Sequence, residues 1–278
     1  MQLNLNGKNA IVTGASYGLG FACAQALAEE GANVSICSRA EDKVVDAVQK
    51  IEEAVKAKYQ SYAYTPGDKR EPPRFFGLGA DLTTESDLNR VVDESQKTFG
   101  DIDVLVLSTG HPPTYPFSVA TDEQWQRGID LLLRPAIVLP RLLIPAMKKN
   151  NYGRIIFLGS IFGLEAEKSS VIQSTLRTGL NALAKCIATE YAADGITANV
   201  ICPGYFDTPL VQGLAQQYAD SQKVSRETVL QDWADYSPMK KFGKPEDLGA
   251  LVAFLASPRA EFITGTTITI DGGAVRQW

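Results

Sequence analysis

Histidine and cysteine, two residue types that bind many transition metals in proteins, are scarce in this sequence. Its 278 residues include one histidine, His111, which cannot form a metal site by itself, so zinc chemistry is not expected. The four cysteines, Cys23, Cys37, Cys186 and Cys202, lie far apart without a Cys-x-x-Cys pair. Three of them fall in predicted core elements, so we interpret the cysteines as free thiols that are mostly buried.

Long apolar runs and basic runs are also missing. No apolar segment reaches the roughly 18 residues of a membrane-spanning helix, and residues 1–6 have no signal-peptide character. The formal net charge is −5, so neither nucleic acid nor an anionic membrane is an expected partner. We therefore expect a cytoplasmic protein. With 45% hydrophobic residues, the chain has enough apolar side chains for a single α/β domain over residues 1–278.

Short β-branched runs alternate with longer segments of helical period, which predicts an α/β fold with a doubly wound, seven-stranded parallel sheet. The expected strands are 10–13, 33–37, 75–78, 104–107, 154–158, 197–201 and 266–270, and the expected helices are 19–30, 41–58, 85–99, 122–149, 171–194 and 246–256. Right-handed crossovers place the carboxyl ends of such strands along one edge, where a ligand would bind.

Two segments interrupt this alternation. Residues 59–74 contain Pro-Gly and Pro-Pro pairs with mixed charge, which indicates an exposed inserted loop. Residues 205–242 have no strand pattern but show helical apolar spacing after the sixth strand. We interpret them as a small helical lid over the substrate, with simple packing helices as the alternative.

A glycine turn follows the first expected strand, at Gly14, Gly18 and Gly20. Backbone N–H groups at the start of the next helix have no partner within that helix, and the helix dipole favours an anion there. Gly14 permits a sharp turn, Gly18 permits close approach of a ligand, and Gly20 permits close packing of helix on sheet. The turn therefore suits a pyrophosphate, although a tight turn without a ligand would also need these glycines.

The end of the second expected strand indicates which dinucleotide would bind. An acidic residue there would hold the adenosine ribose of NAD, but the sequence has Ser38 followed by Arg39. A guanidinium can bind a 2′-phosphate, which favours NADP(H); a solvated surface charge is the alternative for Arg39. Asp81 and Leu82 follow the third strand and are placed to contact adenine, unless Asp81 caps the helix near Thr84.

With residues 13–20 (Thr-Gly-Ala-Ser-Tyr-Gly-Leu-Gly), Asp81-Leu82, Pro203-Gly204 and 262–273, the chain resembles the short-chain dehydrogenases/reductases over nearly its whole length, and in particular 3-oxoacyl reductases. The resemblance implies a Rossmann-type oxidoreductase with a small-molecule substrate. It also implies a homodimer or homotetramer, with the helix 171–194 at the dimer interface. The cofactor contacts that it implies are Gly14, Ser16, Tyr17, Gly18, Leu19, Ser38, Arg39, Asp81, Leu82, Ser108, Gly110, Arg177, Pro203, Gly204 and Thr208.

The family's catalytic residues are an asparagine, a serine and a Tyr-x-x-x-Lys pair, and this sequence keeps one of the four. Ser160 matches the serine, whereas Gln173 stands at the tyrosine position and Arg177 at the lysine position. Leu132 stands where the asparagine is expected, and the usual Asn-Asn-Ala-Gly is Leu-Ser-Thr-Gly at 107–110. The resemblance therefore implies an atypical site built on Ser160, Gln173 and Arg177.

These replacements change what the site can do with a proton. In the usual site, the lysine lowers the pKa of the tyrosine, which protonates the carbonyl oxygen. Gln173 has no proton to give at neutral pH, but its amide can donate a hydrogen bond to an oxyanion together with Ser160. Arg177, one turn further along the helix, can still hold the nicotinamide ribose but cannot shuttle a proton.

Three functions remain open from the sequence. The first is an NADP(H)-dependent carbonyl reductase whose proton comes from water, Tyr115 or Tyr205. The second is hydride transfer to the β-carbon of a conjugated enone, as in enone-reducing relatives of bacilysin- and aeruginosin-type pathways that the chain resembles. The third is a redox-inactive nucleotide-binding protein or a non-redox catalyst. Neither the substrate nor the direction of the reaction follows from the sequence.

Four further residues have a structural and a functional interpretation. We expect Trp125 and Phe162 to be core residues rather than substrate contacts. We expect Arg134 to be a surface or interface arginine, with an anchor in the pocket as the alternative. His111 follows Gly110 at the mouth of the expected crevice, where we expect a plain loop residue rather than an acid or a cofactor contact.

Overall fold

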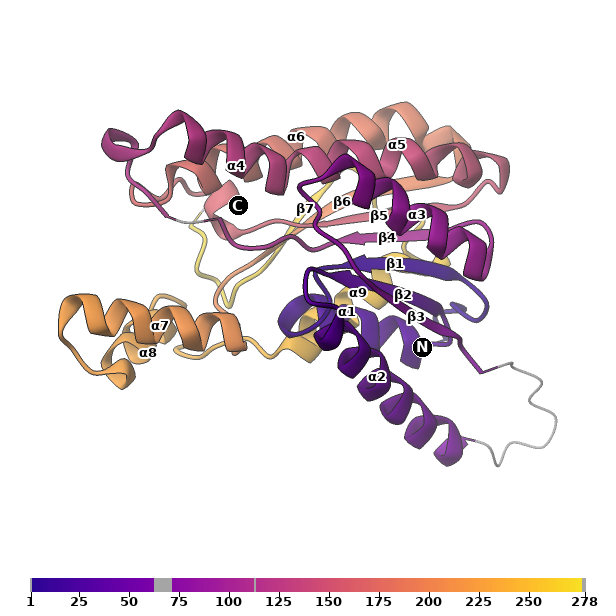
Figure 1. Cartoon of the computed structure of the whole chain (residues 1–278), viewed down its shortest axis with the longest axis horizontal. Helices are drawn as coiled ribbons and strands as arrows, with labels where there is room; N and C mark the ends of the chain where they lie inside the picture. The colour runs from indigo at the N-terminus through magenta and orange to yellow at the C-terminus, as the bar shows by residue number, and fades with distance from the viewer. Residues whose placement is uncertain (1, 63–71, 113, 277–278) are drawn as a thin grey trace.

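In the computed structural model of the protein, residues 2–62, 72–112 and 114–276 are described, except for the side chains of 59–62. The strands form one parallel sheet of order β3-β2-β1-β4-β5-β6-β7 (Figure 1). They are β1 (Asn9–Thr13), β2 (Asn33–Ser38), β3 (Phe75–Gly79), β4 (Val104–Leu107), β5 (Gly153–Leu158), β6 (Ile196–Pro203) and β7 (Thr267–Ile270). All seven predicted strands are confirmed to within two residues at each end, and so is the doubly wound fold class.

Helices cover both faces of the sheet. They are α1 (Gly18–Glu29), α2 (Glu41–Tyr62), α3 (Glu85–Phe99), α4 (Asp122–Leu132), α5 (Arg134–Lys149), α6 (Val171–Tyr191), α7 (Pro209–Gln222), α8 (Arg226–Asp235) and α9 (Pro245–Ala256). Short 3-10 turns occur at Phe117–Val119, Ile161–Gly163, Ala192–Asp194 and Pro258–Ala260. In Figure 1, α1, α2 and α9 lie below the sheet, and α3, α5 and α6 lie above it.

Successive side chains of β1 explain why the core has two layers. Ala10 and Val12 pack in the cluster under α1, α2 and α9, whereas Ile11 packs in the cluster under α3, α5 and α6. Strand side chains alternate between faces, so a strand that is covered on both faces is apolar throughout. The strand order reverses between β1 and β4, and the carboxyl ends of these two strands flank the position where doubly wound sheets bind ligands.

Three of the expected helices have other boundaries. The helix predicted over 171–194 ends as α6 at Tyr191 and is followed by the 3-10 turn Ala192–Asp194. The helix predicted over 122–149 is divided at Leu133 into α4 and α5, because Pro135 has no N–H to continue the ladder and its ring excludes the carbonyl four residues earlier. The helix predicted over 41–58 continues as α2 to Tyr62, so the first residues of the predicted loop 59–74 are helical. Residues 63–71 of that loop lie outside the described part of the chain.

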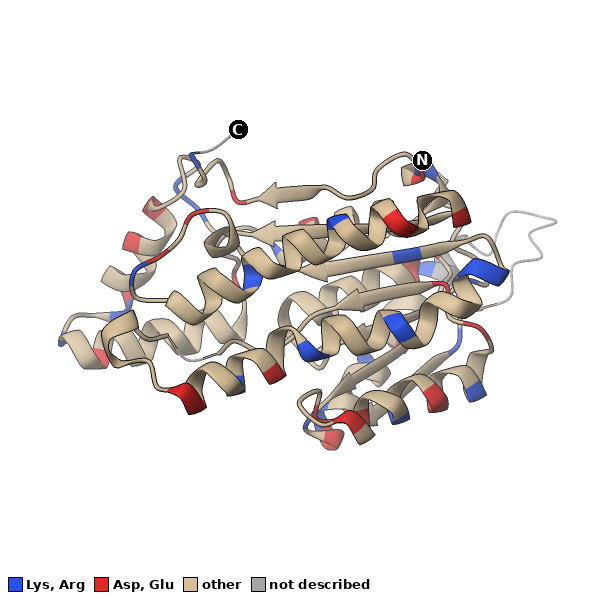
Figure 2. Cartoon of the chain, turned by 90° about the horizontal axis from the view of Figure 1, so that it is seen from above, with Lys and Arg blue, Asp and Glu red and all other residues tan. Residues whose placement is uncertain are grey.

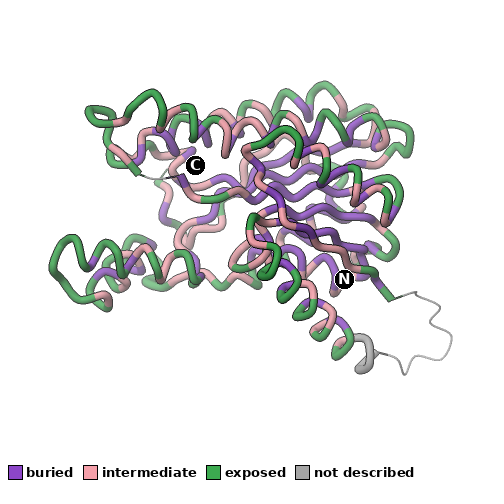
Figure 3. Tube along the Cα trace, in the orientation of Figure 1, coloured by how far each residue is buried: buried purple, intermediate pink, exposed green. Residues whose placement is uncertain are grey.

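The predicted lid segment, 205–242, contains α7 and α8. In Figure 1 these two helices project away from the layered body, and Figure 3 shows them mostly exposed. They pack on each other through a small cluster of Ala215, Ala219 and Val229. The pair therefore has a core of its own, separate from the two layers on the sheet.

Among the described residues, no helix is both long enough and apolar enough to span a bilayer. In Figure 2, acidic and basic residues are interspersed along the helices in view, rather than gathered by sign. Neighbouring charges of opposite sign form pairs, for example Lys50 with Asp46 at 2.6 Å.

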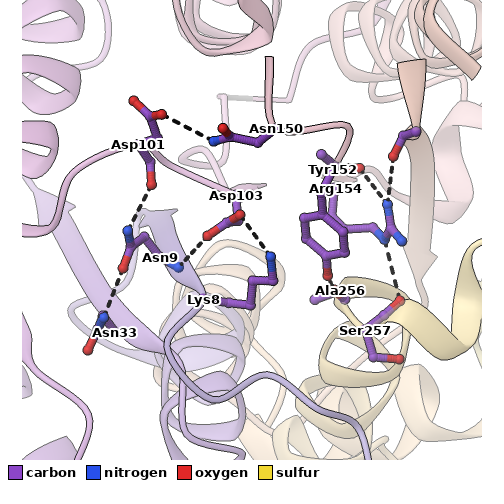
Figure 4. Close-up of polar contacts among 12 residues, drawn as sticks. Lys8, Asn9, Asn33, Asp101, Asp103, Asn150, Tyr152, Arg154, Ala256 and Ser257 are labelled. Carbon is purple, nitrogen blue, oxygen red and sulfur yellow. Dashed lines mark hydrogen bonds and ion pairs between the residues drawn. The ribbon is translucent and has the colours of Figure 1, made fainter. Parts of the chain in front are cut away.

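A polar network ties the strands together at the amino edge of the sheet, opposite the ligand edge (Figure 4). The Asn9 Nδ2 atom donates to the carbonyl oxygens of Phe99 (3.0 Å) and Asp101 (2.8 Å). Its Oδ1 accepts from Asn33 Nδ2 at 2.8 Å, and its backbone N–H donates to the Asp103 carboxylate at 2.9 Å. One side chain thus joins β1 to β2 and to the segment that leads into β4.

Replacing Asn9 with alanine is expected to lower the free energy of unfolding by about 2–4 kcal/mol, because buried partners lose their hydrogen bonds. Urea unfolding followed by circular dichroism measures the change. The matched control is Asn89→Ala, since Asn89 donates to the Glu85 carbonyl oxygen on the exposed side of α3. That variant should stay within about 0.5 kcal/mol of the parent. Equal effects of the two substitutions would contradict a structural role for the network.

A second group of contacts at this edge joins β5 to the end of α9 (Figure 4). The buried Arg154 guanidinium lies over the Tyr152 ring at 4.2 Å and donates to the Gly195 carbonyl oxygen at 3.0 Å. The Tyr152 hydroxyl donates to the Ala256 carbonyl oxygen at 2.5 Å. Polar contacts thus join the elements at the amino edge of the sheet, and the cavity described below opens at the carboxyl edge.

Candidate active site

The loop from β1 to α1 is as tight as its glycines predict. Gly14 and Gly18 have φ values of 58° and 64°, in the region that favours glycine. A Cβ atom on Gly14 would lie 2.5 Å from the Ser108 carbonyl oxygen, and one on Gly20 would lie 2.4 Å from the Gly14 carbonyl oxygen. The N-cap residue Tyr17 makes no capping bond with its side chain, so the first N–H groups of α1 keep their capacity for an anion.

A cavity of about 1060 Å³ opens beside this turn at the carboxyl edge of the sheet. It is lined by residues of β2, β5, β6, α1, α2, α4, α6 and the start of α7, together with the loops that follow β1, β3 and β4. The predicted site residues among them are Gly14, Ser16, Tyr17, Leu19, Ser38, Arg39, Asp81, Leu82, Ser108, Gly110, Ser160, Gln173, Arg177, Pro203, Gly204 and Thr208. Gly18 does not line the cavity but faces Thr208. A Cβ atom added to Gly18 would lie 3.7 Å from the Cβ atom of Thr208.

Ser38 and Arg39 lie at one end of the cavity. The Ser38 hydroxyl is buried, and within the described chain it has no hydrogen-bond partner. Buried hydroxyls without a partner are uncommon and costly, so this atom fits a polar ligand group. The Arg39 side chain is exposed beside it, and Lys43 from α2 lines the same cavity. Two cations, Arg39 and Lys43, therefore line the cavity close to the end of β2.

The Asp81 carboxylate is hydrogen-bonded to Thr83, which bears on whether Asp81 contacts adenine or caps a helix. Its Oδ1 accepts from the Thr83 backbone N–H at 3.0 Å and from the Thr83 hydroxyl at 2.8 Å. This is the geometry of an Asx turn that leads into α3, whose N-cap is Thr84. The carboxylate therefore supports the start of the helix, and Asp81 also forms part of the cavity wall.

Ser160 lies two residues after the end of β5, is half-buried and lines the cavity. Its Oγ accepts from the Phe162 backbone N–H at 3.2 Å, which caps the 3-10 turn Ile161–Gly163. That bond uses a lone pair of the oxygen and leaves the hydroxyl proton available. The Ser160 hydroxyl can therefore donate to a ligand in the cavity while it remains fixed by the cap.

Arg177 is buried on α6, and it grips the end of β5. Its Nη1 donates to the carbonyl oxygens of Leu158 (3.0 Å) and Gly159 (2.5 Å). The Nε atom has no partner among the described residues. Burial lowers the pKa of Arg177 to about 10, so it stays charged near neutral pH. The ribose contact expected for Arg177 stays a prediction; the structure shows that this side chain fixes the strand end that precedes Ser160.

Gln173 and His111 lie next to each other, although 62 residues separate them in the chain. The Nε2 atoms of the two side chains are 3.3 Å apart, and Gln173 is only 2% exposed. Burial, together with the nearby Arg177 cation, lowers the pKa of His111 to about 4. His111 is therefore neutral near neutral pH. The interpretation of His111 as a loop residue, rather than an acid or a cofactor contact, stays a prediction; the structure adds that this loop residue lines the cavity and contacts Gln173.

The two tyrosines considered as proton donors differ in position. Tyr115 does not line the cavity but packs beside Leu132 and Ile172. Tyr205 lines the cavity and stacks on Trp233 from α8, with ring centroids 5.3 Å apart. Burial raises the pKa of Tyr205 to about 12, so its hydroxyl keeps its proton at neutral pH. Of these two tyrosines, Tyr205 alone is in a position to contact a substrate.

The remaining candidates divide between core, wall and surface. Trp125 packs in the cluster around Leu132, as expected, whereas Phe162 belongs to the cavity wall and not to the core. Arg134 lies outside the cavity and bonds Asp130 Oδ1 at 3.1 Å, which matches a surface arginine. The start of α7 contributes Leu210, Val211 and Leu214 to the wall, so that part of the predicted lid borders the cavity.

The cysteines are free thiols. Cys23, Cys37 and Cys202 are buried and Cys186 is exposed. Burial raises the pKa of Cys37 to about 12 and that of Cys202 to about 11, so both are protonated at neutral pH. The described part of the chain holds no cluster of histidine, cysteine, aspartate and glutamate suited to a metal ion.

Known proteins are similar to this chain in sequence and in fold over nearly its full length. A family profile described as enoyl-(acyl carrier protein) reductase matches residues 14–275. D-beta-hydroxybutyrate dehydrogenase of Cupriavidus necator is 31% identical over 98% of this chain and 100% of its own. L-sorbose reductase of Gluconobacter frateurii, solved with NADPH and L-sorbose, superposes with a TM-score of 0.90 at 29% identity over the full length of both chains. The chain therefore belongs to the short-chain dehydrogenase/reductase family, whose members are oxidoreductases that use a nicotinamide cofactor.

Proposed function

We propose that the protein is an NADP(H)-dependent reductase that transfers a hydride to a small carbonyl compound through Ser160, Gln173 and Arg177. One observation carries this proposal: a single cavity joins the uncapped start of α1, the cations beside Ser38, and the polar end formed by Ser160 and Gln173. L-sorbose reductase and an actinorhodin polyketide ketoreductase were both solved with NADPH, which supports the choice of cofactor.

The residues at the first end of the cavity fit a dinucleotide with a 2′-phosphate. The N–H groups at the start of α1 suit the pyrophosphate, and the buried Ser38 hydroxyl needs a polar partner. Arg39 and Lys43 suit the 2′-phosphate because both are cations. Position 38 is a serine, so no carboxylate there would repel the phosphate. When bound, the nicotinamide supplies the hydride, and the protein supplies position and charge.

The polar end of the cavity suits the stabilisation of an oxygen on which negative charge develops. The Ser160 hydroxyl and the Gln173 amide are both donors that need not lose a proton to act. The buried Arg177 cation, which donates to the Leu158 and Gly159 carbonyl oxygens before Ser160, favours negative charge near this end. The Tyr205 hydroxyl or water is then left to deliver the proton to a carbonyl substrate.

Reduction of a conjugated enone is the second candidate, and the same polar end favours it. None of Ser160, Gln173 and neutral His111 is an acid near neutral pH. Hydride addition to the β-carbon creates an enolate, whose oxygen needs a hydrogen bond more than an immediate proton. The family profile that matches the chain bears the name of an enzyme that reduces enoyl groups, which supports this candidate.

Fluorescence titration with NADPH and NADH, followed by stopped-flow mixing with a panel of ketones and a panel of conjugated enones, tests the proposal. Oxidation of NADPH by a ketone supports the first candidate, and oxidation by an enone alone supports the second. Binding of NADPH without turnover by either panel would favour a redox-inactive or non-redox role. Failure to bind either nucleotide would overturn the proposal.

Replacing Arg39 with alanine is expected to weaken NADPH binding by about 10- to 100-fold, because the 2′-phosphate loses a charge-assisted hydrogen bond. The affinity for NADH, which has no such phosphate, should stay within about twofold of the parent. Titration of nucleotide fluorescence measures both. Lys149→Ala, at the exposed end of α5, is the control for loss of one positive charge. Equal loss of affinity for NADPH and NADH would contradict the assignment of Arg39.

We also propose that the protein is a homodimer or homotetramer, by analogy with its family, with α6 at the interface. Large apolar side chains are exposed on neighbouring helices, including Ile129 of α4 and Ile137 and Leu142 of α5. These side chains would be removed from water if another copy of the chain covered these helices. Light scattering of the purified chain measures the oligomeric state.

A further inference from the structure

The side chain at the tyrosine position of the family, Gln173, is held by a residue that the family's catalytic pattern does not include. His111 lies just beyond β4 and Gln173 on the first turn of α6, so the two elements meet through this pair. Within the described chain, the Gln173 carboxamide has the His111 ring as its one side-chain partner. Both residues line the cavity that also contains Ser160.

The chemistry of the two nitrogen atoms determines the form of the imidazole. A carboxamide nitrogen carries two protons and donates, but does not accept. His111 Nε2 must therefore accept, which requires a neutral ring with its proton on Nδ1. An imidazolium in the same place would present a second donor to the amide and a second cation to Arg177. The contact and the electrostatics thus favour the same neutral form.

We infer that His111 is a positioning residue, which accepts one amide proton of Gln173 and so directs the other amide N–H to the substrate oxygen beside Ser160. The catalytic consequence of this inference rests on the proposed function, whereas the hydrogen bond between His111 and Gln173 does not depend on it. His111 transfers no proton in this scheme. A tyrosine ring is held in one orientation by packing, whereas a free carboxamide would rotate about its side-chain torsions. The hydrogen bond to His111 fixes the orientation of the Gln173 carboxamide.

The charged groups around the His111 ring bear on its behaviour in acid. Arg177 of α6 acts on His111 directly, and its positive charge opposes protonation. Glu123, Arg127 and Asp130 of α4 line the same cavity, but none of them is a cause of the shift. Burial is the largest cause and holds the pKa of His111 at about 4. The pair should therefore survive mild acid and separate only below about pH 5.

The test uses the fact that the chain has one histidine, so its ring nitrogens give a single set of signals in a nitrogen-15 NMR spectrum. The full-length protein is titrated from pH 8 to pH 4 without nucleotide, with circular dichroism to follow folding. We expect the Nδ1–H tautomer and a midpoint below pH 5.5. The Nε2–H tautomer, or a midpoint at or above pH 5.5, would overturn the inference whether or not the protein is a reductase.

A double-mutant cycle then tests the catalytic consequence with the compound that the panels identify. His111→Phe keeps a ring of similar size without a nitrogen, and Gln173→Leu keeps the side-chain volume without an amide. Each is expected to lower kcat by about 10- to 100-fold and to leave the dissociation constant of NADPH within twofold. The double variant should be no slower than the slower single variant. Multiplication of the two losses would show that the residues act independently and would overturn the inference.

A matched pair of variants separates positioning from packing. Gln173→Glu places a carboxylate beside the ring, so the His111 midpoint should rise above that of the parent by at least about one pH unit. His111→Asn restores a hydrogen-bond acceptor without the ring and should recover part of the kcat that His111→Phe loses. Equal activity of His111→Asn and His111→Phe would mean that ring volume alone matters, and would contradict the role assigned to Nε2.

Discussion

Replacing Gly20 with alanine is expected to raise the dissociation constant of NADPH by on the order of 100-fold and to destabilise the fold by about 1–3 kcal/mol. The new Cβ would lie 2.4 Å from the Gly14 carbonyl oxygen and 3.1 Å from Ala15 Cα. Both are backbone atoms, so no side chain can rotate to make room. Relief of the clash must move the first turn of α1 away from β1, together with the N–H groups that would bind the pyrophosphate.

Nucleotide fluorescence and urea unfolding measure the two effects of Gly20→Ala. Gly213→Ala is a matched control, because Gly213 lies within α7 and a Cβ there would meet nothing within 4 Å. That variant should be more stable by up to about 1 kcal/mol, since alanine favours the helix, and should bind NADPH as the parent does. Normal NADPH affinity in Gly20→Ala would mean that the turn does not hold the pyrophosphate.

Replacing Ser160 with alanine is expected to lower kcat by about 100- to 1,000-fold, which is the usual cost of removing one donor to a developing oxyanion. The dissociation constant of NADPH should change by less than about threefold, because Ser160 lies at the polar end of the cavity and not at the end with Arg39. Single-turnover mixing with NADPH isolates the hydride-transfer step from binding and product release.

A second serine supplies the control for Ser160→Ala. Ser257 caps the 3-10 turn Pro258–Ala260 by accepting from the Arg259 backbone N–H at 3.2 Å, the same kind of bond that Ser160 accepts from Phe162. Ser257 does not line the cavity. Ser257→Ala should therefore lose a cap of the same kind and keep its activity. Equal losses of kcat in the two variants would show that the cap, rather than the hydroxyl proton, matters at Ser160.

The departure from the family's catalytic pattern has a structural consequence beyond lost acidity. Arg177, which the sequence predicts at the lysine position, donates to Leu158 and Gly159 at the end of β5, just before Ser160. A guanidinium has several donors in a fixed plane and can bind two carbonyl oxygens at once, which an ammonium group does less well. The replacement therefore gives the serine a rigid support, in keeping with a site that relies on fixed hydrogen bonds.

The prediction of the strands succeeded because its signals lie within a few residues. A strand that is covered on both faces is a short apolar run, which the sequence displays directly. The glycine turn depends on a close approach between Gly14 and Gly20, which are only six residues apart. The helix boundaries failed where a local signal competed with another. Pro135 ends one helical pattern and begins the next, so periodicity continues across a break in the hydrogen-bond ladder at Leu133.

By itself, the sequence determined the sheet and its crossovers and the tight glycine turn after β1, and it predicted the roles of Ser38 and Arg39 and the loss of the family's tyrosine and lysine. Each of these depends on neighbouring residues or on a fixed helical spacing. The tertiary structure alone decided that His111 meets Gln173, that Arg177 binds the end of β5, and that Tyr115 points away from the cavity. Such contacts join residues that are distant in the chain, and they depend on how β4, β5 and α6 dock, which no local pattern records.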